Sequence, residues 1–363
     1  MRCPQTRLNR TTRVKRLVVA LTALGLTQVA RADQVVADGT SYADAKVVGF
    51  EQGRLAFRAA DGQLRNVFVD QVDLILMDRG GLFADFNQAE RYLHMGDREN
   101  AVVRYRRTLR LAGEFWPELI DARLLKACDH PSMLDQAAAS FLRAARGRYS
   151  GPTAAARLIP RGFPQQRDGK VVGALDQLDA AISKETDETT SLPTRFFRYE
   201  ILRRTGDLRA TSESRSIALS AIPQAVRCER IFEIQFAALA EVLKDGGSAE
   251  ELGGLDSAIR DCPESALPSF LLLKGRTLLA AASTRDELIR ASWPLMRVVV
   301  HMPDDSRAAE GLYAAAEALE RLGNNDKAIE LLRECVAHKQ VPDETRQRAE
   351  TSLARLQSPT GPS

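Results

Sequence analysis

The stretch LERLGNNDKAIELL, residues 319–332, decides the fold of this chain. Two runs with helical spacing of apolar residues meet there at a short polar turn. Gly323 is suited to the left-handed conformation that ends a helix, and the polar residues after it are good turn and N-cap residues. Matching apolar faces lie on both sides, with Leu312, Ala315, Ala316 and Leu319 before the turn and Ala328, Leu331, Leu332 and Cys335 after it. The stretch therefore predicts an antiparallel helical hairpin.

The same arrangement occurs near the start of the chain. Gly96 precedes Ala101 by five residues, as Gly323 precedes Ala328, and Tyr105 completes an Ala-x3-aromatic pair. A second set of this kind begins 36 residues after Ala101 and consists of Ala137, Phe141 and Ala144. In its small residues at helix crossings, its aromatic pairs and its period, the chain resembles the tetratricopeptide (TPR) family.

The C-terminal half carries a more specific likeness. The turn MPDD at residues 302–305 is followed by SRAAEGLYAAAEALERLG at residues 306–323. Pro303 ends one helix and Asp305 or Ser306 caps the next. VPDE at residues 341–344 repeats the device about 39 residues later. In this pattern the chain is similar to exported bacterial TPR proteins of the cell envelope.

The repeats predict a mainly α fold, a TPR-like helical-hairpin solenoid. The likeness covers residues 82–147 and 265–356. We expect hairpins at 82–147 and 261–357, degenerate hairpins at 171–260 and a disordered tail at 358–363. Stacked hairpins form a curved array, whose inner face is lined by the first helix of each pair.

Residues 33–79 have a different pattern, with short runs rich in β-branched and aromatic residues. Leu55 and Phe57 alternate with polar or small neighbours, as in a half-buried strand. Turns are marked by Asp38-Gly39, Gln52-Gly53 and Asp61-Gly62. The pattern predicts an antiparallel meander that packs on the first helices, with Phe68 and Ile75 as candidate contacts. It resembles small SH3-like or Sm-like barrels, which implies a small antiparallel β-barrel-like domain.

Residues 1–32 have the order of regions of a secretory signal peptide. Basic residues precede an apolar run at 17–30 that is short for a membrane span, and Ala30-Arg31-Ala32 gives the small-x-small cleavage pattern. The alternative is an uncleaved membrane anchor. Cleavage removes seven of the 51 basic residues and none of the 48 acidic ones, so the net charge falls from +3 to −4. The basic pI is therefore no indication of nucleic-acid binding, and we expect a periplasmic or extracellular protein.

Export would permit disulfides in the mature chain. Cys128, Cys228, Cys262 and Cys335 allow three full pairings, and the alternative, favoured for Cys335, is a free thiol buried on a helix face. The histidines lie far apart, which argues against a zinc site. The sequence contains no P-loop, GxSxG, HExxH or Rossmann glycine pattern. We therefore expect no cofactor, no metal and no enzymatic activity.

The expected function is a protein-binding scaffold in the periplasm or cell envelope. From the TPR resemblance, the candidate partner-binding residues of the concave face are Phe83, Phe86, Glu90, His94, Tyr313, Glu317, Glu320 and Arg321. Phe83 and Phe86 have an alternative role in packing on the β-segment. Trp116 and Trp293, each followed by proline, are expected in packing between repeats rather than in a ligand site.

A second function class depends on residues 143–170, which hold seven basic residues and one acid. Glycine and proline interrupt this region, so residues 148–170 are interpreted as a linker or long surface loop. The cations that would hold an anionic glycan or lipid head group are Arg143, Arg146, Arg148, Arg157, Arg161, Arg167 and Lys170. Such attachment would weaken as salt screens it, whereas binding in a hydrophobic groove would not.

We predict export and cleavage between Ala32 and Asp33, because the basic, apolar and small-residue regions stand in the required order. N-terminal sequencing of the exported protein should begin at Asp33. Recovery of the protein from the envelope with Met1 intact would contradict the prediction.

Overall fold

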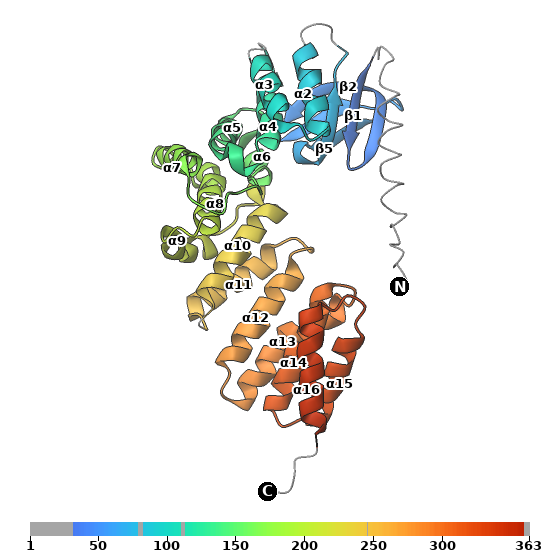
Figure 1. Ribbon diagram of the computed structural model, residues 1–363, viewed down its shortest axis with the longest axis vertical. Helices are drawn as coiled ribbons and strands as arrows, with labels where there is room; N and C mark the ends of the chain where they lie inside the picture. Colours follow the sequence, from blue (N-terminus) through green and yellow to red (C-terminus); the bar gives the residue numbers. More distant parts are fainter. Residues whose placement is uncertain (1–31, 79–82, 110–112, 245, 359–363) are drawn as a thin grey trace, which may run out of the picture.

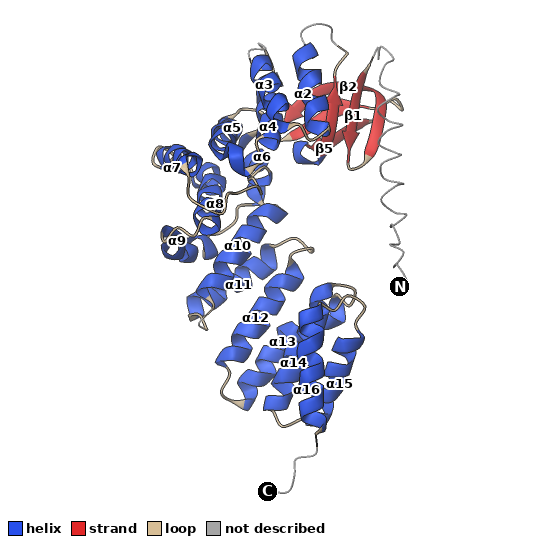
Figure 2. Ribbon diagram, viewed as in Figure 1, coloured by secondary structure: helices blue, strands red, loops and turns tan. Residues whose placement is uncertain are grey.

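The computed structural model describes residues 32–78, 83–109, 113–244 and 246–358. The molecule is elongated, with a β-sheet at one end and helices that follow one another in chain order to the other end (Figure 1). The strands all gather at the N-terminal end, as Figure 2 shows. The predicted signal peptide at 1–32 and the predicted tail at 358–363 lie almost wholly outside the described residues.

The strands form one antiparallel sheet in the order β4-β3-β2-β1-β5. Their bounds are β1 Asp33–Ala37, β2 Thr40–Glu51, β3 Arg54–Arg58, β4 Leu64–Phe68 and β5 Val72–Leu76. Val35 of β1 pairs with Tyr42 of β2 on one side and with Ile75 of β5 on the other. The antiparallel meander is confirmed. The barrel-like closure is not, because within the described residues β4 and β5 do not pair and the sheet is open.

The two tight hairpins of the sheet have the backbone that their sequences predict. Asp38-Gly39, with φ of 48° and 73°, joins β1 to β2, and Gln52-Gly53, with φ of 49° and 75°, joins β2 to β3. Positive φ at both central residues is the type I′ geometry, whose twist matches that of paired strands. The expected alternation of β3 is also present, since Leu55 and Phe57 are buried, Ala56 between them is half-buried and the terminal arginines are exposed.

Helices make up most of the rest of the described chain. They are α2 Ala84–His94, α3 Arg98–Thr108, α4 Trp116–Ala127, α5 Leu134–Arg146, α6 Gly151–Arg157, α7 Gly169–Ile182, α8 Glu188–Arg204, α9 Arg209–Ala218, α10 Glu229–Val242, α11 Ala249–Asp261, α12 Leu267–Ala281, α13 Arg285–His301, α14 Ser306–Arg321, α15 Asn325–Ala337 and α16 Asp343–Gln357. Short 3-10 turns lie at η2 Val69–Gln71, η4 Pro131–Met133 and η5 Gln224–Val226. Most consecutive helices pack on each other, and α14 also packs on both α12 and α16. The mainly α fold built from helical hairpins is confirmed.

Three hairpins share one turn geometry. Their glycines, Gly96, Gly206 and Gly323, have φ of 83°, 68° and 76°. The N–H of the next residue donates to a carbonyl five residues earlier, in the pairs Asp97–Tyr92, Asp207–Leu202 and Asn324–Leu319. This bond belongs to the Schellman motif, which ends a helix. The side chain of Asn324 then accepts the N–H of Lys327, so α15 begins directly after α14 has ended.

Small residues lie where paired helices cross. Ala101, Ala137 and Ala328 are fully buried, as the repeat pattern predicts. Gly275 of α12 lies so close to α13 that a Cβ there would come within 2.4 Å of the Leu295 side chain. Larger side chains at these positions would push the helices apart, because protein interiors are already close-packed.

One hydrophobic core joins the sheet to the helices. It runs from Val35 in β1 to Phe270 in α12, and smaller clusters hold the C-terminal helices. Phe83 and Phe86 lie in this core together with Ile75 of β5. Of the two roles expected for these phenylalanines, the structure therefore shows packing on the β-segment.

Residues 148–170, interpreted as a linker or loop, contain a docked helix. Pro152 lies in the first turn of α6, where proline is tolerated, and the alanines of α6 are buried. Gly53 in the β2–β3 turn packs closely on this helix, since a Cβ there would lie 2.9 Å from the Cα of Ala154. Gly151 and Pro152 therefore mark the start of a short helix that packs against the β2–β3 turn, whereas residues 158–168 form a loop, as predicted.

The two tryptophans lie in different environments. Trp116 is buried, with its ring 5.0 Å from that of Phe83, as expected for packing between elements. Trp293 on α13 is 69% exposed, so the prediction that it packs between repeats is wrong. Its neighbour Pro294 is buried instead, because the two residues lie on different faces of the helix.

We predict that Ala328→Leu destabilises the protein by ~1–3 kcal/mol, because a larger side chain overpacks a fully buried helix crossing. Glu330→Leu, on the exposed face of the same helix, is the matched control and should change stability little. Urea unfolding followed by circular dichroism measures both. The same free energy of unfolding for the two variants would contradict the helix register.

Candidate functional site

A groove between α14 and α16 brings together the C-terminal residues that the sequence singled out. Its volume is about 380 Å³, and it is lined by Tyr313, Ala316, Glu317, Glu320, Arg321, Leu332, Arg348, Ser352 and Arg355. α12, α14 and α16 form one row of helices, because α14 packs on both of the others. Such a row lines one face of a stack of hairpins.

Helix spacing positions the side chains of α14. The helix begins after Asp305, whose carboxylate accepts the N–H of Arg307 at 2.9 Å, and it carries alanines on its buried faces. Tyr313, Glu317 and Glu320 follow at intervals of four and three residues, so they lie on one face of the helix. This face is turned toward α16.

Cation–aromatic and ionic contacts cross the groove. The guanidinium of Arg348 lies over the ring of Tyr313, 4.5 Å from its centroid. Arg355 forms an ion pair with Glu320, with 2.7 Å between Nη2 and Oε2. The hydrogen bond from Arg355 lowers the pKa of Glu320, so the pair stays ionised at neutral pH. Glu317 is exposed and forms no ion pair with a described residue.

Arg321 contributes mainly to the structure. Its guanidinium donates to the carbonyl of Leu279 at 2.6 Å and to that of Ala282, at the C-terminal end of α12. Cations at this end of a helix bind its free carbonyls and complement its dipole. Arg321 thus fastens α14 to α12 as well as lining the groove, and its predicted contact with a partner stays a prediction.

The α16 side of the groove was missed by sequence reasoning. It consists of Arg348, Ser352 and Arg355, which follow at intervals of four and three residues. That spacing was available in the sequence and places the three side chains on one helix face. The sequence did not show that α16 packs on α14, which is the contact that turns this face toward Tyr313.

The N-terminal candidates do not form a groove. Phe83, Phe86 and Glu90 are buried, and only His94, at the end of α2, is exposed. The prediction that the first three residues bind a partner is wrong. The physical reason is that the sheet covers the face of α2 that the repeat pattern leaves for a partner.

Glu90 lies at the centre of a buried polar cluster. Arg123 of α4 donates to both carboxylate oxygens, at 2.7 and 2.8 Å, and the Tyr105 hydroxyl donates to the same group. The N–H of Ile75 donates to it at 2.8 Å, and Arg123 also donates to the carbonyl of Val72 at 2.6 Å. Burial lowers the pKa of Arg123, but attraction to Glu90 outweighs this and raises it above its ordinary value. The buried charges of Glu90 and Arg123 thus neutralise each other, and the cluster holds α2 and α4 against β5.

The predicted cations of residues 143–170 are mostly occupied within the protein. Ion pairs join Arg143 to Asp121, Arg157 to Asp70, Arg161 to Glu233 and Arg167 to Asp207, while Lys170 donates to the carbonyl of Ser132 and Arg148 lies over the ring of Tyr149. Arg146 is exposed. These cations do not form a common anion site, because acids from other parts of the chain pair with four of the arginines.

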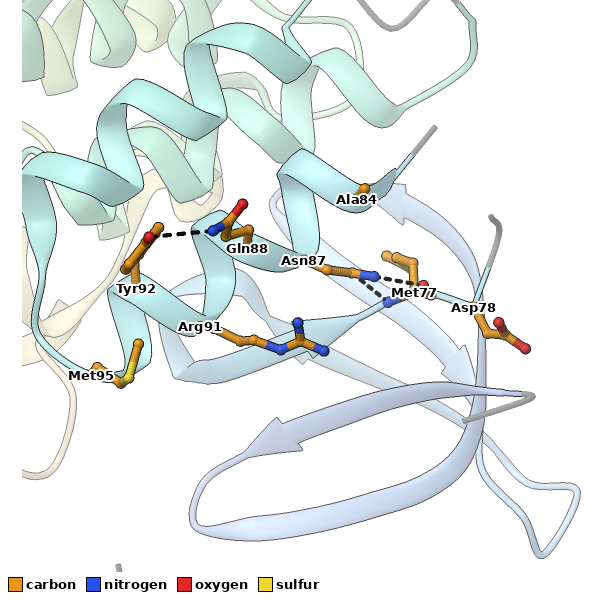
Figure 3. Close-up of a pocket in the computed structure, with 8 residues that line it drawn as sticks. All are labelled: Met77, Asp78, Ala84, Asn87, Gln88, Arg91, Tyr92 and Met95. Carbon is orange, nitrogen blue, oxygen red and sulfur yellow. Dashed lines mark hydrogen bonds between the residues drawn. The ribbon is translucent and has the colours of Figure 1, made fainter. Parts of the chain in front are cut away.

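A second hollow, of about 640 Å³, lies beside α2 at the end of β5 (Figure 3). Its lining consists of Met77, Asp78, Ala84, Asn87, Gln88, Arg91, Tyr92 and Met95. The Asn87 amide accepts the N–H of Met77 and donates to its carbonyl, both at 2.8 Å, and Gln88 donates to the Tyr92 hydroxyl at 3.3 Å. These polar groups serve the junction of strand and helix, and we assign no ligand to the hollow.

The four cysteines within the described residues, Cys128, Cys228, Cys262 and Cys335, are free thiols, so none of the three possible pairings is present among them. The expectation for Cys335 is confirmed: its thiol contacts the Ala309 carbonyl at 3.2 Å, and burial raises its pKa to about 11.

Within the described ranges no three His, Cys, Asp or Glu side chains gather as metal ligands. No described helix combines the length and apolar character needed to cross a bilayer.

No protein-family model and no curated protein matches the chain. Comparison with solved structures found a similarity to the crystal structure of a thermophilic TPR protein from Thermus thermophilus. The sequence identity is 15%, the similarity covers 51% of this chain and 92% of that chain, and the TM-score is 0.32. At this TM-score the similarity carries no argument about function, and the hairpin fold stands on the turns and helix crossings of the chain itself.

Proposed function

We propose that the protein is a non-enzymatic scaffold that holds a protein or peptide partner in the groove between α14 and α16. The observation that carries the proposal is the set of side chains that these two helices turn into the groove. Tyr313 and Arg348 are of the residue types that most often dominate protein interfaces. Glu317 adds a carboxylate that is unpaired within the described residues.

The chemistry of the groove favours a polypeptide over a small metabolite. Small-molecule sites are mostly apolar and enclose the ligand. This groove is lined on both walls by charged side chains, with Glu317 on α14 and Arg348 and Arg355 on α16. Groups of both signs along one groove suit a polypeptide, which offers side chains of both signs and backbone amides.

We further propose that the scaffold works after export, in the periplasm or cell envelope. The support is the sequence of residues 1–32, with its basic, apolar and small-residue regions in signal-peptide order. We do not retain polyanion binding by residues 143–170 as a second candidate, because most of those cations already have partners.

The proposal predicts that Tyr313→Ala, Glu317→Ala and Arg348→Ala, combined in one variant, lower partner recovery from the organism's envelope fraction by more than about tenfold. Truncation of an interface hot spot costs at least ~2 kcal/mol, and every 1.4 kcal/mol is a factor of ten in affinity. Arg321 is left in place because it holds α12 to α14. Circular dichroism and the melting temperature should match those of the parent.

The matched control combines Arg333→Ala and Glu334→Ala, which change exposed residues of α15 outside the groove. A photo-crosslinking amino acid at position 317 should join the same partner, whereas one at position 333 should not. If the triple variant recovers every protein that the parent recovers, the partner binds elsewhere and the proposal fails.

A further inference from the structure

An apolar row lies exposed along α13. Trp293, Val300 and Ile289 are 69%, 64% and 36% exposed, and half-buried Met296 lies between the first two. The four residues follow at intervals of four, three and four residues. They therefore form one narrow stripe on the helix, which we call the α13 stripe.

The α13 stripe is separate from the groove. Leu295 and Val298, on the opposite side of α13, are the residues buried against the neighbouring helices. Gly311 of α14 faces α13, since a Cβ there would lie 3.1 Å from the Leu295 carbonyl, whereas Tyr313 faces the groove. Packing among the described helices thus leaves Trp293 and Val300 largely uncovered and Ile289 partly so, whereas Met296 also packs against the core cluster of α12–α14.

Unpaired positive charge accompanies the α13 stripe. Arg290 and Arg297 flank it on one side, and Arg285 lies near its N-terminal end. Within the described residues, none of these three guanidinium groups forms an ion pair. Of the nearby acids, Glu287 is used in the capping box with Thr284, and Asp286 stands at the start of the helix. Asp286 lies one turn before Arg290 on the same flank, so Arg290 and Arg297 outnumber the acid there and the flank carries a net positive charge.

The spacing of the α13 stripe is that of a coiled-coil seam. Intervals of four, three and four place Ile289 and Met296 at d positions and Trp293 and Val300 at a positions. Arg290 and Arg297 then occupy e positions, where charge selects the partner. We propose that the α13 stripe docks an amphipathic helix of another protein, with apolar residues in the same heptad spacing and Asp or Glu beside them.

A second copy of this chain fits less well in antiparallel orientation. In an antiparallel pair, e positions face e positions, so Arg290 and Arg297 of the two copies would repel each other. An anionic bilayer would match the arginines, but helices that lie on bilayers present a broad apolar face. A seam this narrow matches the width of one helix.

The test uses the full exported chain and a synthetic three-heptad helical peptide with Leu at a and d and Glu at e and g. The glutamates keep the peptide from pairing with itself. The chain has two tryptophans and Trp116 is buried, so a change in fluorescence reports Trp293. We expect a saturable blue shift, and at least tenfold weaker binding of a peptide with Lys in place of Glu.

A second part of the test reverses the charge of the arginines beside the α13 stripe. The double variant Arg290→Glu, Arg297→Glu should prefer the Lys peptide. Trp293→Ala, followed by anisotropy of a labelled Glu peptide, should lose at least tenfold in affinity. Leu208→Ala, which truncates an 89% exposed leucine far from α13, and the α15 double variant Arg333→Ala, Glu334→Ala should bind as the parent does.

Equal affinity for the Glu and Lys peptides would overturn the proposal, as would unchanged binding by Trp293→Ala. A blue shift with vesicles of phosphatidylglycerol and phosphatidylcholine but with neither peptide would assign the stripe to a bilayer instead. A dimer in sedimentation velocity that Trp293→Ala abolishes would assign it to a second copy. Because the stripe variants and the groove variants change different residues and are tested with different partners, failure here is distinguishable from failure of the groove proposal.

Discussion

The buried ion pair between Arg123 and Glu90 is the interaction on which the arrangement of the molecule depends. Neither side chain has exposed surface, and together they connect α4, α2 and the backbone of β5. Removal of one partner from such a pair leaves an uncompensated buried charge, at a cost of roughly 3–5 kcal/mol. That is a large part of the net stability of a typical domain. The sheet is therefore held firmly against the first helices. It covers one face of α2, so no partner can bind to that face.

A second buried arginine–glutamate pair of this kind lies further along the chain. Arg230 of α10 bonds to the buried carboxylate of Glu200 on α8 at 3.3 Å and to the carbonyl of Pro160 at 2.7 Å. In both clusters an arginine on a helix joins a glutamate on another helix to the backbone of a non-helical segment. Arg157 adds a related contact, since it pairs with Asp70 and lies 3.8 Å from the ring centroid of Phe68. None of these contacts involves α14–α16, where the groove lies.

Local physics made part of the structure predictable. The hairpin at Gly323 follows from a left-handed glycine, an Asn cap and apolar spacing, all of which lie within a few residues of each other. Glu90 shows where such reasoning fails. The position of Glu90 in its helix matches that of a residue on the concave face of a repeat. Its ion-pair partner Arg123, however, lies 33 residues later in the chain, and β5, the strand that covers Glu90, lies before it. Periodicity shows which residues share a helix face, but it does not show what covers that face, which is also why Trp293 was misplaced and Arg348 missed.

Hydrogen exchange of the backbone amides, read by mass spectrometry, tests most directly whether the Arg123–Glu90 pair makes the sheet and the first helices one unit. The comparison is between the parent, Arg123→Met, and Arg104→Met as a control that breaks a partly exposed ion pair with Asp85. The account predicts that in Arg123→Met, β1–β5 and α2–α4 lose protection together while α12–α16 keep theirs, and that the control resembles the parent. Faster exchange of the sheet alone, with α2–α4 protected as in the parent, would contradict it.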